Sequence, residues 1–219
     1  MDELTKGVLR FERDIYPKRK DFFDSLSARQ DPRALFITCS DYRVVPSDIT
    51  DSDAGDLFTI RNAGNIVPPY GEVMGGVSAT IEYAVMVLGV KNIIVCGHTH
   101  CGAMSAALHP EKITHMPIVR SWLNNCESAV RIVAGYKELP EQDRLKALVE
   151  ENVLAQLGHL RTHPSVAAAL ASGEMDLFGW VFDIEHGRVT TYDASEGAFV
   201  PMSEDHVTNA TPKRRRRNP

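Results

Sequence analysis

Short apolar runs rich in strand-forming residues recur along the chain, and polar or glycine-containing sequence follows each of them. Three runs, Ala34–Cys39, Leu57–Asn62 and Asn92–Gly97, have the length and composition of strands buried on both faces of a sheet. Between the second and the third, apolar residues recur at helical spacing from Val73 to Leu88. This spacing predicts a helix of about four turns. The pattern therefore contains a strand, a helix and a strand in succession.

The first thirty residues predict two short helices. Apolar residues recur in the segments Val8–Ile15 and Phe22–Leu26, and Pro17 between them is a helix breaker. Aromatic, partly apolar helices of this kind expose surface that a partner would cover. We therefore expect this N-terminal helical arm to contribute to an interface, in at least a homodimer.

The second half of the chain predicts three more helices and a closing hairpin. The helices are expected over residues 118–133, over residues 145–160 and in a short segment after Pro164. The last apolar stretch predicts a strand over Leu177–Ile184, a turn at His186–Gly187 and a strand over Val189–Tyr192. Strands that alternate with helices are typical of an α/β fold with a mainly parallel central sheet flanked by helices, and the hairpin adds an antiparallel edge strand.

Composition excludes several classes of protein. The chain has 219 residues, of which 43% are hydrophobic and 24% charged, as in soluble globular proteins. We expect a single domain over residues 1–203, with the arm of residues 1–30 included in it. No apolar run reaches the roughly 18 residues of a membrane-spanning helix, and the first residues do not resemble a secretory signal. A cytoplasmic protein without membrane partners is therefore expected.

The charge distribution separates the C-terminal end from the rest of the chain. The formal net charge is −5, and the run Lys213–Arg217 contributes five positive charges, so the remaining residues carry −10. An acidic body offers no electrostatic footprint for nucleic acid, and no nucleic-acid partner is expected. The basic run is interpreted as part of a disordered tail over residues 204–219.

Four cysteines occur in the chain: Cys39, Cys96, Cys101 and Cys126. Without an export signal they do not indicate a disulfide framework, and metal binding or catalysis is the better interpretation. Cys96 lies inside an apolar run and Cys126 in a helical stretch, and thiols in such places usually act as small buried hydrophobic groups. Cys39 and Cys101 are therefore the candidates for chemistry.

These two cysteines lie where two predicted strands end. The first strand ends with CSDYR at residues 39–43, and the third ends with CGHTHC at residues 96–101. Ligands bind beyond the carboxyl ends of parallel strands, so the two ends are expected to meet. Cys39, Cys101 and His98 then form a set that zinc binds in a tetrahedron. His98 is favoured over His100 because three residues separate it from Cys101.

Asp41 and Arg43 have two interpretations. One is a surface ion pair, which contributes about 0–1 kcal/mol. In a cleft beside a metal, Arg43 would instead keep the Asp41 carboxylate ionised and oriented to accept a hydrogen bond from water. If Arg43 released it, the same carboxylate would occupy the fourth position of the zinc and close the site.

The ordered motifs resemble those of the β-class carbonic anhydrases. CSDYR matches their C-x-D-x-R motif and HTHCG their H-x-x-C-G motif, and the resemblance continues through GDLFTIRNAGN, IEYA, ENV and GWVFDI over roughly residues 3–200. The pattern is most similar to bacterial members associated with cyanate utilisation and to the plant-like branch. The resemblance implies one zinc per chain, reversible hydration of carbon dioxide to bicarbonate and a proton by zinc hydroxide, and a homodimer or higher oligomer formed through the N-terminal helices.

The resemblance also implies roles for individual residues. Cys39, His98 and Cys101 match the constant zinc ligands, and Asp41 matches the ligand that closes the site in some members. Arg43 matches the arginine that pairs with this aspartate, so the two form the catalytic pair. The residues that match substrate-binding positions are Gln30, Phe58, Ala63, Tyr83 and, through its backbone N–H, Gly102.

Two positions bear on whether the site is active. Phe36 stands where members with a regulatory bicarbonate pocket have tryptophan, so we expect an open site with Asp41 away from the metal. Tyr42 stands where the family usually has serine or another small residue, and its phenol would either point away or crowd the metal loop. Two alternatives remain: hydrolysis of carbonyl sulfide or carbon disulfide at the same site, and a non-catalytic zinc-binding homologue.

Overall fold

The computed structural model describes residues 1–28, 30–71 and 75–208. The chain divides into two compact units, of which the first is Met1–Asp31 and the second begins at Pro32. The first unit therefore ends one residue after the predicted arm of residues 1–30. The basic run Lys213–Arg217, which we expect to be disordered, lies outside the described residues.

The first unit is a succession of four helical segments. They are α1 (Asp2–Arg10), the π-helical η1 (Phe11–Ile15), the 3₁₀-helical η2 (Tyr16–Arg19) and α2 (Lys20–Ala28). The predicted break falls at η2, where Pro17 occupies the first turn, a position that needs no backbone N–H donor. The rings of Tyr16 and Phe23 stack with centroids 5.3 Å apart.

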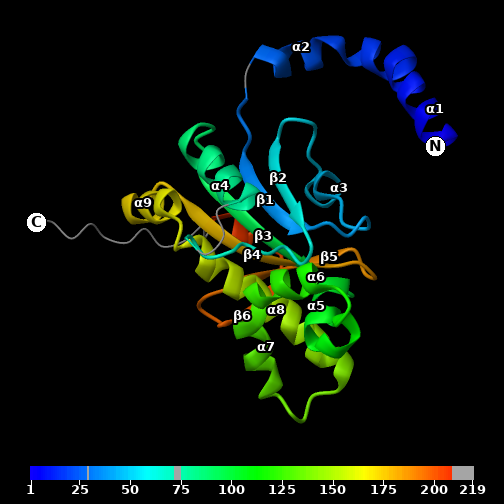
Figure 1. The fold of residues 1–219 in the computed structure, drawn as a ribbon. Helices are drawn as coiled ribbons and strands as arrows, with labels where there is room; N and C mark the ends of the chain where they lie inside the picture. Colours follow the sequence, from blue (N-terminus) through cyan, green and yellow to red (C-terminus); the bar gives the residue numbers. More distant parts are fainter. Residues whose placement is uncertain (29, 72–74, 209–219) are drawn as a thin grey trace, which may run out of the picture. The chain divides into compact units, whose positions relative to one another are not determined.

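The second unit is built on one six-stranded sheet, with the strand order β2-β1-β3-β4-β5-β6. The strands are β1 (Ala34–Cys39), β2 (Leu57–Asn62), β3 (Asn92–His98), β4 (Asp176–Asp183), β5 (Arg188–Asp193) and β6 (Ala198–Pro201). The first four are parallel, and β5 and β6 extend the sheet in antiparallel fashion (Figure 1). The predicted α/β class, the mainly parallel sheet and the antiparallel edge are confirmed. The edge strand β6 was not predicted.

Helices connect and cover the strands of this unit. They are α3 (Pro46–Thr50), α4 (Gly76–Met86), α5 (Gly102–Leu108), η3 (Pro110–Ile113), α6 (Pro117–Leu123), η4 (Asn124–Cys126), α7 (Glu127–Ala134), α8 (Glu141–Leu160), α9 (Pro164–Ser172) and α10 (Asp205–Thr208). The last of these lies within the predicted tail of residues 204–219. Within the described ranges, no helix is long and apolar enough to cross a membrane.

Two helix predictions need correction. The single helix predicted over residues 118–133 is wrong, because η4 separates α6 from α7. Asn125 lies at this interruption and donates from Nδ2 to the Trp122 carbonyl at 2.8 Å, and such local bonds from asparagine compete with helical ones. The helix predicted from Val73 to Leu88 is shorter, since α4 covers Gly76–Met86, and Val73 lies outside the described residues.

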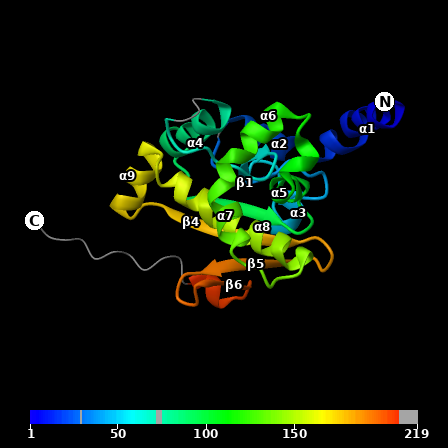
Figure 2. The same cartoon turned by 60° about the horizontal axis from the view of Figure 1, so that its bottom comes forward.

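The long helix α8 packs closely on the sheet, on the side where α5 to α8 gather (Figure 2). A Cβ atom added at Gly97 of β3 would lie 2.9 Å from Val149 Cγ1, and one added at Gly179 of β4 would lie 2.9 Å from Val153 Cγ1. Both strands therefore carry glycine where the helix lies closest. This contact brings α8 near the carboxyl end of β3, where the candidate ligands lie.

Candidate metal centre

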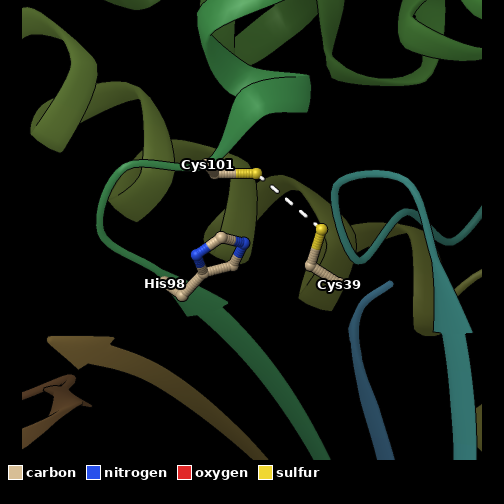
Figure 3. Close-up of side chains that lie close together, drawn as sticks. All are labelled: Cys39, His98 and Cys101. Carbon is tan, nitrogen blue, oxygen red and sulfur yellow. Dashed lines mark hydrogen bonds between the residues drawn. The ribbon is translucent and has the colours of Figure 1, made fainter. Parts of the chain in front are cut away.

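Three donor side chains meet at the carboxyl ends of two neighbouring parallel strands. Cys39 is the last residue of β1, His98 is the last residue of β3, and Cys101 directly precedes α5. The two sulfurs lie 3.9 Å apart, and the donor atoms of all three residues lie within 4.8 Å of one another. The residues are 5%, 0% and 1% exposed, respectively, and their side chains point toward one another in Figure 3.

The state of His98 shows that this group fits a metal ion. Its Nδ1 lies 2.9 Å from the Thr99 carbonyl oxygen, which only accepts, so Nδ1 is the donor and, in the neutral imidazole, Nε2 keeps the lone pair. Nε2 is buried and has no hydrogen-bond partner among the described residues. A buried polar atom without a partner is costly, and a cation between this lone pair and the two sulfurs removes the cost. Two sulfurs and one imidazole are a donor set that zinc prefers.

The two thiols of the group form a hydrogen bond with each other. The hydrogen bond between them lowers the pKa of Cys39 and raises that of Cys101 above its usual range, and burial adds to the rise at Cys101. The backbone N–H of Gly64 also donates to the Cys39 sulfur, at 3.4 Å. A cation held by both sulfurs would take the place of this hydrogen bond, because thiols bind metals in their deprotonated form.

The other two cysteines lie apart from this group. Burial raises the pKa of Cys96 to about 12 and that of Cys126 to about 11, so both are neutral thiols near pH 7. Cys126 donates to the Leu123 carbonyl at 2.9 Å. Both are fully buried, as expected of thiols that act as small hydrophobic groups.

Arg43 holds the Asp41 carboxylate beside the donor group. Its Nε donates to Asp41 Oδ1 at 2.9 Å and its Nη2 to Oδ2 at 2.6 Å, and this pairing keeps the pKa of Asp41 well below its usual range. Nη2 also donates to the His100 carbonyl at 3.1 Å, which ties the two metal-site loops together. Asp41 Oδ2 lies 4.0 Å from His98 Nε2. The carboxylate therefore faces the donor group while it remains bound to Arg43.

The loop that carries Asp41 has two further features. Arg61, on β2, donates to the backbone carbonyls of Asp41 at 2.7 Å and Cys39 at 3.2 Å. Tyr42 is 87% exposed, so its phenol points away and does not crowd the metal loop. Arg61 lies within the motif GDLFTIRNAGN, but the sequence comparison assigned it no role, because its contacts with main-chain carbonyls appear only in the folded structure.

The predicted substrate-binding residues lie on several elements. The rings of Phe58 on β2 and Tyr83 on α4 are 6.0 Å apart. Ala63 precedes Gly64, whose N–H contacts Cys39, and Gly102 is the first residue of α5, directly after Cys101. Gln30 is exposed and belongs to the first unit, so its predicted contact with substrate stays a prediction.

Comparisons with known proteins agree with this geometry. The family model for carbonic anhydrase matches residues 34–189. A carbonic anhydrase from Pseudomonas aeruginosa is 52% identical over 204 residues, which are 93% of each chain. The chain belongs to the carbonic anhydrase family. Its members bind zinc, and the Cys-His-Cys group of this carbonic anhydrase is suited to that ion.

Solved structures assign this carbonic anhydrase to the β class. The structure of the β-carbonic anhydrase CcaA superposes with a TM-score of 0.90 at 43% identity, and covers 93% of this chain and 92% of its own. A second similar structure comes from Sordaria macrospora and is described as one of two tetrameric β-carbonic anhydrases, with a TM-score of 0.73, 29% identity and coverage of 91% and 95%. The predicted family is confirmed.

Proposed function

We propose that this chain catalyses the reversible hydration of carbon dioxide to bicarbonate and a proton, with one zinc ion held by Cys39, His98 and Cys101. The observation that carries the proposal is the buried group of two sulfurs and one imidazole, in which His98 Nε2 forms no hydrogen bond within the described part of the chain. Zinc bound there supplies the Lewis acidity that makes hydroxide available from water near neutral pH.

Asp41 and Arg43 act on the nucleophile. The guanidinium keeps the carboxylate ionised and fixes its direction with two parallel hydrogen bonds. Asp41 Oδ2, on the side facing His98, accepts a hydrogen bond from the attacking water and orients it. Since Arg43 also contacts the His100 carbonyl, it keeps Asp41 from moving onto the metal.

The substrate has no charge and no dipole, so it is held by dispersion and by exclusion of water. The apolar surfaces of Phe58, Ala63 and Tyr83 suit this role, and they bind bicarbonate weakly enough to release it. The Gly102 N–H donates to the substrate oxygens as negative charge develops there, and the resemblance implies the same role for the Gln30 amide.

The arm gives the chain a surface for self-association. Neither α1 nor α2 contains a buried residue, and Leu4, Val8 and Leu9 are more than half exposed. Apolar surface of this extent is stable in water when a second copy covers it. A homodimer or higher oligomer in the cytoplasm is the state we assign, and the tetrameric relative from Sordaria macrospora supports it. Light scattering on the full chain measures the assembly mass.

The test of the function combines metal content with stopped-flow carbon dioxide hydration. The purified protein is expected to hold one zinc per chain and to hydrate carbon dioxide, and Asp41→Asn is expected to keep zinc and lose rate. Parallel assays on carbonyl sulfide and carbon disulfide distinguish hydrolysis of those substrates. A protein that holds zinc without hydrating carbon dioxide would instead be the non-catalytic homologue, a reading that the exposed Tyr42 does not favour.

A further inference from the structure

One peptide group in the turn after β2 lies between an indole and a proposed metal ligand. Its N–H belongs to Gly64 and donates to Cys39 Sγ at 3.4 Å. Its C=O belongs to Ala63 and accepts from Trp122 Nε1 at 2.8 Å. Because this peptide is trans, its C=O and N–H point in opposite directions. The two hydrogen bonds therefore form one chain from Trp122 through the peptide to the sulfur.

The turn around this peptide is held firmly. Asn62, the last residue of β2, pairs in register with Cys39, which brings the turn to the metal centre. Gly64 has φ of +82°, and a Cβ atom there would lie 2.9 Å from Met104 Cε. On its other side, the Gly64 carbonyl accepts from Asn152 Nδ2 at 3.0 Å. Both peptide groups that flank Gly64 are thus fixed by side chains, and one of them contacts the sulfur.

We propose that Trp122 is a positioning residue of the metal centre, whose indole N–H fixes and polarises the Ala63–Gly64 peptide so that its N–H draws negative charge from the Cys39 sulfur. Hydrogen bonds in a chain polarise one another, so the indole strengthens the bond to sulfur. Partners of this kind tune how strongly a ligand donates to its metal. The inference rests on the proposed function, in which Cys39 is a zinc ligand.

The two tryptophans of the chain provide a matched pair of variants. Trp122→Phe keeps an aromatic ring and removes the N–H, whereas Trp180→Phe makes the same change on β4, where Trp180 packs against Phe36 with centroids 6.0 Å apart. Each protein is loaded with Co²⁺, and its absorption spectrum is recorded. Subtraction of the spectrum of the metal-free protein gives the energy of the thiolate-to-cobalt charge-transfer band. Competition with a chelator gives the zinc dissociation constant.

The band is expected to move to lower energy in Trp122→Phe, because a sulfur with a weaker hydrogen bond gives up an electron more readily. It is expected to stay in place in Trp180→Phe. The zinc dissociation constant is expected to rise ~10-fold in Trp122→Phe alone, because a sulfur that the peptide no longer holds in place can turn away from the ion, and this loss outweighs its stronger donation. A band that stays in place in folded Trp122→Phe, or moves equally in both variants, overturns the inference.

Two additional variants keep the outcome decisive. If Trp122→Phe does not accumulate as folded protein, Trp122→Leu is judged by the same band and the same control. Cys39→Ser tests the ligand assignment separately, because it must weaken the charge-transfer band if Cys39 binds the metal. An undiminished band in Cys39→Ser contradicts the proposed ligand set, whereas a diminished band with no effect of Trp122 contradicts only the positioning role.

Discussion

Replacement of Gly64 by alanine tests how tightly the turn beside the metal centre is built. Two costs add at this position. A side chain at φ +82° costs about 1–2 kcal/mol in backbone strain. The added Cβ would also lie 2.9 Å from Met104 Cε and 3.2 Å from Ala103 Cβ, and overpacking of this kind costs about 1–3 kcal/mol. The free energy of unfolding is therefore expected to fall by about 2–5 kcal/mol.

Gly173→Ala is the matched control for this variant. Gly173 has φ of +74°, but nothing lies within 4 Å of a Cβ added there, so it carries the backbone cost without the contacts. Urea unfolding of both variants, at one protein concentration and with zinc in fixed excess, measures the two losses. Gly64→Ala should lose about 1–3 kcal/mol more than Gly173→Ala. Equal losses would show that α5 moves aside freely, and would refute the view that the turn is held against it.

Three further predictions concern the metal centre. Arg43→Lys keeps the positive charge but not the paired hydrogen bonds, so stopped-flow assays should find a lower rate of carbon dioxide hydration at unchanged zinc content. An unchanged rate would show that the orientation of Asp41 does not affect catalysis. Cys39→Ser should lose zinc in metal analysis while Cys96→Ser keeps it, and equal zinc contents would contradict the ligand set. Removal of zinc by a chelator should lower the thermal unfolding midpoint, and added zinc should restore it, because a ligand that binds the folded state stabilises it. A midpoint that does not respond would mean that no metal is bound.

The sequence predicts the strands and the donor group because both depend on local signals. The runs Ala34–Cys39 and Leu57–Asn62 were predicted with the bounds that the structure has, and β3 extends one residue further, to His98. Each of these strands is short, apolar and followed by polar residues. Once β1 and β3 are neighbours in a parallel sheet, their last residues must meet at the same edge. Because Cys39 and His98 are the last residues of these two strands, they lie near each other.

Other features could not be predicted, because they arise from contacts between distant segments. The strand β6 is four residues long and pairs with β5 after a short turn, and so short a run gives little periodicity. The interruption at η4 depends on Asn125, a residue that helices also tolerate. Phe58 and Tyr83 come into contact only when α4 packs on β2. None of these contacts follows from the order of residues in one segment.

Three side chains hold the loops of the metal site through main-chain atoms. Arg61, Trp122 and Asn152 each donate to a main-chain carbonyl, respectively of Asp41, Ala63 and Gly64. Every residue has such a carbonyl, so these contacts place no demand on the side chains at the receiving positions. The demand falls on the donors, and two of them, Arg61 and Asn152, lie within the motifs GDLFTIRNAGN and ENV. The residues that fix the loops lie 20 to 88 positions away along the chain, where only the folded structure brings them to the site.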